Sequence, residues 1–302
     1  MNSIFVVGSV NADLVLQLPH LPTVGETVLG GKFLRTDGGK GANQAIAAAR
    51  LGSPTMLIAA IGFDAFGQDA LIQLRRENVD VSAISTTSEQ TGIAVVLVDS
   101  EGRNLIGVAS GANGSLSGAD VRRGLVGRLT QGDVVVGNLE VGDPAVLAAG
   151  LAARECGAWF VLNPAPARLI PPELLAVCDV LTPNQVEIHS LGFAEPNDAL
   201  AAGVGALIVT LGPNGADLYR RGQEKVHQDA FPMNVVDTTG AGDAFTAGLA
   251  VALAARQTLE EAIRWAAAAG SLATRALGAR AGFPTSTELF GLLSERLTPT
   301  SS

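Results

Sequence analysis

Short apolar runs rich in β-branched residues recur along the chain, and Ala- and Leu-rich stretches with helical spacing separate most of them. The runs are IFVVGSV near residue 4, MLIAAIG near 56, DVVVGN near 133, AWFVLN near 158, DVLTPN near 179 and ALIVTLG near 206. Near-continuous apolar strands that alternate with helices are typical of a parallel sheet covered on both faces. The pattern therefore predicts an α/β fold.

Two segments break this alternation. Residues 10–19, VNADLVLQLP, alternate in polarity, which predicts a strand with one wet face that lies outside the central sheet. Residues 91–113 favour two strands joined by a turn at 100–102. We expect these segments to form a small sheet that projects from the main domain.

The C-terminal part is predicted to be mainly helical. MNVV at 233–236 is predicted to be a strand that Asp237 closes, and helices are expected through about 256 and again from 259 to about 276. The tail, LTPTSS, is expected to fray. Without an internal repeat or a long linker, residues 1–302 are predicted to form one domain.

Composition excludes several classes of protein. With 302 residues, 47% of them hydrophobic, the chain is long and apolar enough to bury a large core. The formal net charge of -9 disfavours binding to nucleic acid or to an anionic membrane. The start, MNSIFVVGSV, lacks the basic n-region of a signal peptide, and no apolar run is long enough to span a bilayer. We expect a soluble, cytoplasmic protein.

Cysteine and histidine give no sign of a metal site. Cys156 and Cys178 do not form a CxxC pair, and the three histidines lie far apart in the sequence. We therefore expect neither a disulfide framework nor a zinc site, and both thiols are expected to lie in the core.

The first glycine-rich stretch is TDGGKGANQAIAAARLG, residues 36–52. It is not a Walker A loop, because Leu34 and Gly41 stand where that loop needs Gly and Ser or Thr, and its glycine spacing does not complete a Rossmann fingerprint. The remaining interpretation is a tight turn that feeds a helix near Asn43 and offers the donors of Lys40 and Asn43 to the hydroxyls of a polyol. The alternative is a helix cap beside a solvated lysine.

The second stretch is DTTGAGDAFTAG, residues 237–248. Successive backbone N–H groups at a helix start near Gly242 would form an anion site. Asp243 would repel a phosphate there, unless it takes a proton from a hydroxyl that attacks a phosphoryl group held by the same amides. That is a kinase arrangement. The alternative is that Asp243 merely caps the helix.

Together the two stretches resemble the signature motifs of the PfkB, or ribokinase-like, carbohydrate kinase family, and the match runs along nearly the whole chain. NAD at 11–13 and NPAPA at 163–167 are closest to the ribose-phosphorylating members. The resemblance implies a doubly wound, mostly parallel sheet flanked by helices, with a β-sheet lid at about 10–36 and 91–112 that also forms a homodimer contact. It implies ATP-dependent phosphorylation of the 5-hydroxyl of D-ribose, with Mg²⁺ accompanying ATP and K⁺ as activator.

The resemblance also implies roles for individual residues. Asp243 would be the general base, and the amides of Gly240, Ala241 and Gly242 would form the anion hole. Sugar hydroxyls would contact Asn11, Asp13, Gly39, Lys40, Asn43 and Glu140.

The remaining motifs concern the nucleotide and the metals. The nucleotide would lie against Asn184, Thr210, Leu211, Gly212, Pro213, Asn214, Gly215, Gly242 and Ala267. Glu187 would bind Mg²⁺ through water, since Mg²⁺ keeps much of its hydration. A monovalent cation would be bound by Asp237, Thr239, Ala273, Ala276, Gly278 and Gly282.

The chain departs from the family at three of these places. Ala267 stands where His or Asn often covers the adenine, Gly282 replaces a serine near the cation, and Arg280 replaces an uncharged residue. Two alternatives stay open. One is a sister kinase for deoxyribose, fructose or a nucleoside, which lid residues such as Ala94 and Ile106 would decide. The other is a sugar-binding regulator without activity, although such a protein has no use for a base.

Overall fold

The computed structural model describes residues 2–295 of the chain. Within these residues the main sheet has nine strands in the order β13-β12-β11-β10-β9-β8-β1-β4-β5, parallel from β5 to β11 and antiparallel at β12 and β13. The strands are β1 (Ile4–Val7), β4 (Thr55–Gly62), β5 (Val79–Thr87), β8 (Val134–Asn138), β9 (Trp159–Asn163), β10 (Val180–Leu181), β11 (Ala206–Thr210), β12 (Ala216–Arg220) and β13 (Val226–Gln228). The predicted α/β fold with a mostly parallel sheet is confirmed.

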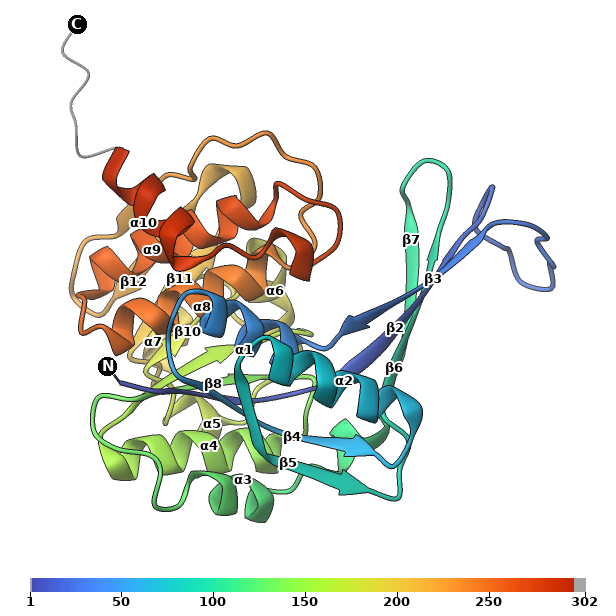
Figure 1. The fold of residues 1–302 in the computed structure, drawn as a ribbon. Coiled ribbons are helices and arrows are strands. Elements are labelled where there is room, and N and C mark those ends of the chain that lie inside the picture. Colours follow the sequence, from blue (N-terminus) through green and yellow to red (C-terminus); the bar gives the residue numbers. More distant parts are fainter. Residues whose placement is uncertain (1, 296–302) are drawn as a thin grey trace, which may run out of the picture.

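Helices cover both faces of this sheet (Figure 1). Along β1, Ile4 and Val6 belong to one hydrophobic cluster and Phe5 and Val7 to the other, as expected for a strand buried on both faces. The first cluster includes residues of α1 (Lys40–Arg50), α2 (Ala65–Arg76), α8 (Ala241–Ala254), α9 (Leu259–Ala273) and α10 (Ser286–Glu295). The second includes residues of α3 (Gly118–Leu125), α4 (Asp143–Cys156), α5 (Pro172–Leu175), α6 (Gln185–Ser190) and α7 (Pro196–Ala201).

A second sheet of four strands projects from this body (Figure 1). Its order is β3-β2-β6-β7, built from β2 (Asn11–Gln17), β3 (Lys32–Gly38), β6 (Gly92–Val98) and β7 (Asn104–Ala109), and we call it the small sheet. The predicted hairpin is its β6–β7 pair. The single wet face predicted for 10–19 is wrong, because residues 13–16 are all half-buried. The small sheet extends beyond the helical layers, so neither face of β2 is fully covered (Figure 1).

The strand predicted at 233–236 is also wrong. The N–H groups of Val236 and Asp237 both donate to the carbonyl of Thr274, at 2.8 and 3.2 Å. Thr274 follows α9, so the loop after that helix binds this segment in place of a neighbouring strand. The two helices that follow it, α8 and α9, end at Ala254 and Ala273, slightly earlier than predicted.

Of the two cysteines expected in the core, Cys178 is buried but Cys156 is exposed. Cys156 is the last residue of α4, which ends at Gly157 in the left-handed conformation before the chain enters β9. Within residues 2–295, no helix has both the length and the apolar character needed to cross a bilayer. The tail at 297–302, expected to fray, lies outside the described residues.

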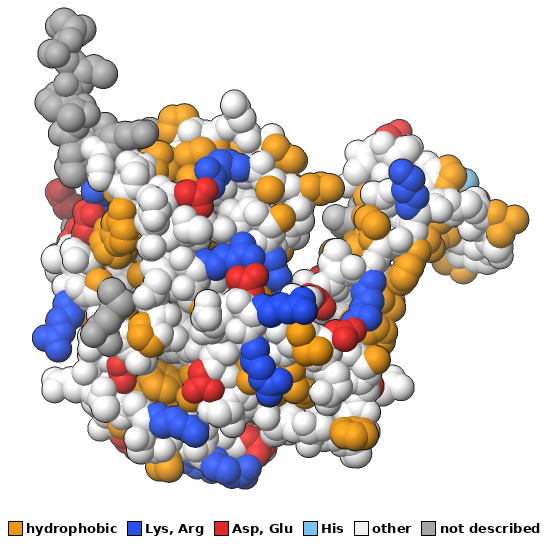
Figure 2. Space-filling view, viewed as in Figure 1, with side chains coloured by type: hydrophobic (Ala, Val, Ile, Leu, Met, Phe, Trp, Pro, Cys, Tyr) orange, Lys and Arg blue, Asp and Glu red, His pale blue; other side chains and the backbone are white. Residues whose placement is uncertain are grey.

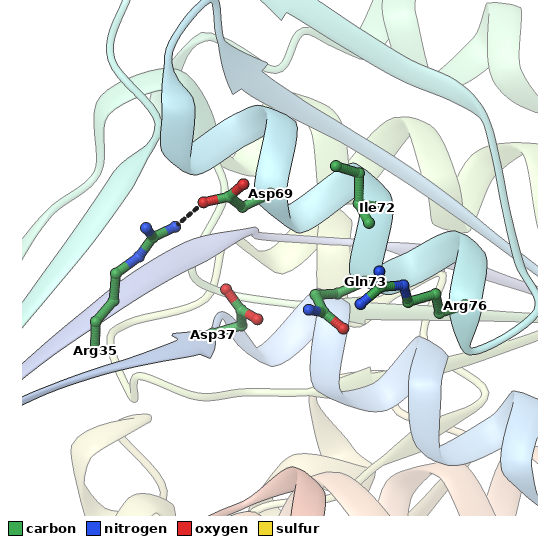
Figure 3. Close-up of a pocket in the computed structure, with 6 residues that line it drawn as sticks. All are labelled: Arg35, Asp37, Asp69, Ile72, Gln73 and Arg76. Carbon is green, nitrogen blue, oxygen red and sulfur yellow. Dashed lines mark hydrogen bonds and ion pairs between the residues drawn. The ribbon is translucent and has the colours of Figure 1, made fainter.

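One ion pair fastens the small sheet to the body. Arg35 on β3 donates to Asp69 on α2 at 2.7 Å (Figure 3). The Arg35 guanidinium also lies 4.5 Å from the ring centre of Phe66. A cavity of about 450 Å³ lies between the two elements, lined by Arg35, Asp37, Asp69, Ile72, Gln73 and Arg76. This contact fixes the strand that leads directly into the first glycine-rich turn.

Candidate active site

The two glycine-rich motifs meet beside the carboxyl ends of the central parallel strands. α1 begins at Lys40 and α8 at Ala241, each directly after a glycine with positive φ. Asn43 Nδ2 donates to Asp243 Oδ2 at 3.0 Å, across 200 positions of sequence. In doubly wound sheets this edge is where ligands bind.

Asp243 is buried, with 6% of its surface exposed. Gln44 Nε2 donates to its second oxygen at 3.2 Å. Burial raises the pKa of Asp243, whereas the charge of Lys40 and the two amide donors oppose that rise. No side chain caps α8, since Gly240 occupies the N-cap. The alternative that Asp243 serves only as a cap is therefore wrong.

A row of buried amides supports this carboxylate from behind. Gln44 Nε2 also donates to Asn163 Oδ1 at 3.1 Å, and Gln44 Oε1 accepts from Asn138 Nδ2 at 3.3 Å. Asn163 Nδ2 in turn donates to the Thr182 carbonyl at 3.2 Å. The sequence analysis missed these three residues. The sequence did contain one indication of this row, because the apolar strands β8 and β9 end in Asn138 and Asn163.

Glu140 holds the start of α1. Its Oε2 accepts from the Lys40 N–H at 3.0 Å and from Asn11 Nδ2 at 3.4 Å, and it also accepts from the Ser9 hydroxyl. A carboxylate at this place satisfies a helix N–H that would otherwise lack a partner. The structure thus gives Glu140 a role in shaping the turn, beside the predicted contact with sugar.

Asp13 on β2 lies against the end of β3. A Cβ added at Gly38 would lie 2.2 Å from Asp13 Oδ2, so a larger residue there would displace the Asp13 carboxylate. Burial raises the pKa of Asp13 to about 6, Glu140 and Asp37 add to the rise, and Arg280 opposes it. Such a carboxyl is poised between hydrogen-bond donor and acceptor near neutral pH.

A second cavity, of about 620 Å³, lies beside the start of α8, between α8 and α9. Of the residues predicted to contact nucleotide, Thr210, Gly212, Pro213, Gly215, Gly242 and Ala267 line it. Leu211 and Asn214 belong to the same loop without lining the cavity, and Asn184 forms a β-bridge with Thr210. A further wall of the cavity, at 230–235, was not predicted from the sequence; it contributes Phe231, Pro232, Met233 and Val235.

One of the three N–H groups predicted for the anion hole is already hydrogen-bonded within the turn before α8. The Ala241 N–H donates to the Thr238 carbonyl at 3.1 Å. A Cβ added at Gly242 would meet nothing within 4 Å, consistent with its place on the cavity wall. The N–H groups of Gly242 and Asp243, in the first turn of α8, have no partner within the helix itself.

Asn184 and Glu187 form a reciprocal capping box at the start of α6. Each side chain accepts from the other residue's N–H at 2.8 Å. Glu187 is half-buried, so its carboxylate can still face a hydrated cation. Among residues 2–295, no group of three or more His, Cys, Asp or Glu side chains could hold a metal ion.

The residues predicted for a monovalent cation lie in two loops that Asp237 joins. Asp237 Oδ1 accepts from the Thr239 N–H and hydroxyl at 2.9 and 2.8 Å, and Oδ2 accepts from the Gly278 N–H at 2.8 Å. Burial alone would raise the pKa of Asp237, but these donors hold it below its usual value. A Cβ at Gly282 would lie 1.9 Å from the Ala273 carbonyl oxygen, so the serine common in the family would not fit this backbone. Ala276 lies half-buried in the same loop.

Arg280, which the sequence left unexplained, reaches the same site. Its Nε donates to Asn43 Oδ1 and its Nη2 to the Gly38 carbonyl, both at 2.9 Å. It is therefore part of the first glycine-rich turn in space, although it lies 237 positions from Asn43 in sequence.

Comparison with known proteins agrees with this geometry. The family model for pfkB family carbohydrate kinases matches residues 1–286. A ribokinase of Bacillus subtilis is 38% identical over 297 residues, covering 97% of this chain and 100% of the relative. A crystal structure of ribokinase from Thermotoga maritima superposes with a TM-score of 0.89 at 30% identity, covering 97% of this chain and 100% of that one. Arabidopsis thaliana ribokinase, solved with ribose and ATP, gives a TM-score of 0.86 at 34% identity, with 97% and 99% covered. The chain therefore belongs to the pfkB family of carbohydrate kinases.

Proposed function

We propose that this ATP-dependent sugar kinase transfers the γ-phosphoryl group of ATP to the 5-hydroxyl of D-ribose, giving ribose 5-phosphate. The observation that carries the proposal is the contact between Asn43 and Asp243, which joins the predicted sugar turn to the rim of the 620 Å³ cavity. The relatives named ribokinase, and the Arabidopsis structure with ribose and ATP, support ribose as the sugar.

In this proposal Asp243 takes the proton from the attacking hydroxyl. Asn43 and Gln44 each hold one oxygen of its carboxylate, so the orientation of its remaining lone pairs is set before the sugar arrives. Burial raises its pKa towards the range in which a base accepts a proton readily.

The start of α8 would hold the charge that develops on the phosphoryl group. Ala241 already bonds to Thr238, so the N–H groups of Gly242 and Asp243 would contribute most to the predicted Gly240–Gly242 anion hole. When bound with ATP, Mg²⁺ would neutralise phosphate charge, and Glu187 would orient one of its waters.

A panel of sugars tests the proposal. ADP release would be measured with ATP and ribose, deoxyribose, fructose or a nucleoside. We expect ribose to give the highest kcat/KM. A sister kinase would prefer another sugar, and a regulator would bind a sugar without releasing ADP; either result would overturn the assignment.

We further propose that two copies associate through the small sheet. Phe33, Leu34, Leu105, Ile106 and Val108 are 46–63% exposed there, and apolar side chains follow the projecting sheet (Figure 2). Apolar side chains that are exposed in this number on one small sheet are typical of an interface. Light scattering after size exclusion should give the mass of a dimer, and Ile106→Asp should give that of a monomer. A monomeric unmodified protein would contradict this assembly.

A further inference from the structure

Arg280 bridges three parts of the sugar site that are distant in sequence. It lies in the 3₁₀ turn η3 (Arg280–Gly282), and 16% of its side chain is exposed. Besides its bonds to Asn43 and to the Gly38 carbonyl, its Nη1 lies 3.8 Å from Asp37 Oδ2. The Arg280 guanidinium thus contacts Asn43 in the first turn of α1, and Gly38 and Asp37 at the end of β3.

The bond from Arg280 fixes which way the Asn43 amide points. A guanidinium has only donors, so the amide oxygen must face Arg280. The NH₂ group then faces Asp243, where it donates at 3.0 Å. If the amide were reversed, its oxygen would face the carboxylate and repel it. Arg280 and Asp243 therefore hold the Asn43 amide in this orientation from its two ends.

The geometry of this contact requires arginine specifically. Nε and Nη2 bond two different acceptors at once, which the rigid fork of a guanidinium can do and a lysine ammonium cannot do in the same way. The backbone of Arg280 is also held, because Arg50 donates to its carbonyl at 2.6 Å. Arg50 is itself fixed by two bonds to Glu77, at 2.7 and 2.8 Å. The backbone that carries the Arg280 guanidinium is therefore held in place by Arg50.

We propose that Arg280 is a positioning residue of the phosphotransfer reaction, which orients Asn43 towards Asp243 and fastens β3 to η3. The inference rests on the proposed role of Asp243 as base. It assigns the charge at position 280 a function in the reaction, because an uncharged residue there would remove one of the two groups that hold the amide of Asn43.

A double-mutant cycle tests whether Arg280 acts through Asn43. We expect Arg280→Ala and Asn43→Ala each to lower kcat by roughly 10- to 100-fold, the scale on which misplacing a reacting group acts. The double variant should be no slower than Asn43→Ala alone, because the path through Asn43 is already broken. Multiplicative losses would overturn the proposal. Thermal melting of every variant would identify losses that come from unfolding.

Two further readouts separate positioning from a structural role. In Arg280→Gln, Asp243 loses an oriented donor and a nearby positive charge, so the acidic limb of the kcat/KM profile for sugar should move to higher pH. Millimolar guanidinium should partly restore Arg280→Ala, and Arg280→Lys should remain slow. The inference would be contradicted if the acidic limb of the kcat/KM profile stayed in place and guanidinium did not restore activity.

Arg275→Ala is the matched control. Arg275 belongs to the same loop and pairs with Glu288 at 2.7 Å, outside the site, so its loss should leave kcat and the pH profile unchanged. Asp243→Asn separates this inference from the proposed function. If that variant keeps a normal kcat, the assignment of the base fails. If it is slow while the Arg280 and Asn43 losses multiply, only the role of Arg280 fails.

Discussion

At the residue scale, the environment of Asp243 decides what the site can do. Burying a charged carboxylate to 6% exposure costs free energy, even when two amides donate to it. Neither of these hydrogen bonds caps a helix, so capping does not explain why the carboxylate is buried. Buried titratable groups with perturbed pKa values, beside a cavity, are typical of reacting groups.

Asp243→Asn tests the base directly. Asparagine keeps the size of the side chain but cannot accept the hydroxyl proton, so kcat should fall by roughly 10²-fold or more, the usual scale for loss of a general base. Sugar binding, measured by calorimetry, should survive. A variant with nearly normal kcat would refute the assignment.

Asp13 should make stability depend on pH. Its folded pKa of about 6 lies above the usual 3.8, so its stabilising contribution is fully present below about pH 4 and is lost as the pH rises through 6. Asp13→Asn removes that titration. The Tm of this variant relative to the unmodified protein should therefore rise between pH 5 and pH 7. A difference in Tm that does not change with pH would show that Asp13 is not held neutral by the fold.

The sequence predicted some of these residues and missed others for a physical reason. Asn43 and Asp243 lie in glycine-rich turns whose composition is itself a signal. Gln44 lies beside Asn43 and Arg280 lies outside both stretches, but the partners of both side chains are brought together only by the tertiary structure. Their roles could not be derived from neighbouring residues.

At the element scale, the loops around Asp237 should couple a monovalent cation to the rate. We propose that K⁺ accelerates turnover several-fold over Na⁺, because the ion would lie beside the turn that aims the Gly242 amide. Asp237→Ala should abolish the difference. Initial rates in KCl and NaCl at equal ionic strength would check this, and equal rates for the unmodified enzyme would exclude a functional cation site.

The cavity between α8 and α9 gives a separate prediction. Ala267 is 5% exposed and lines it, so Ala267→Leu should fill space needed by a nucleotide. We expect the KM for ATP to rise roughly tenfold or more, since even one methylene group in a pocket can change specificity by that factor. The KM for sugar serves as the internal control. If both constants rise equally, the cavity is not the nucleotide site.

Elements were easier to predict where burial dictated their pattern. The apolar runs correspond to β1, β4, β8, β9, β10 and β11 of the main sheet. MNVV has an equally apolar pattern without a neighbouring strand, so it became a loop bonded to Thr274. β-propensity alone does not form a strand where no partner edge is available.

At the scale of the whole molecule, the Arg35–Asp69 pair should matter more for function than for stability. Both side chains are at least one-third exposed, so the pair is worth about 1 kcal/mol or less. Arg35→Ala should change Tm little but raise the KM for sugar, because β3 ends at the proposed sugar site. The KM for ATP should stay constant, since the small sheet does not line the 620 Å³ cavity proposed for the nucleotide.

Arg103→Ala provides the matched control for this variant. Arg103 is an exposed arginine of the small sheet that pairs with Asp99 at 2.7 Å in the turn between β6 and β7, away from the body. It should leave both KM values unchanged. Equal effects of the two substitutions would mean that the contact with α2 has no special role.

The row of buried amides behind Asp243 limits the routes open to a proton. Gln44, Asn138 and Asn163 donate and accept hydrogen bonds but do not titrate, so none of them can act as an acid or a base behind Asp243. If Asp243 is the base, the proton that it takes up would therefore not leave through this row. The amides would keep the carboxylate in place while the proton leaves on the side that faces the substrates.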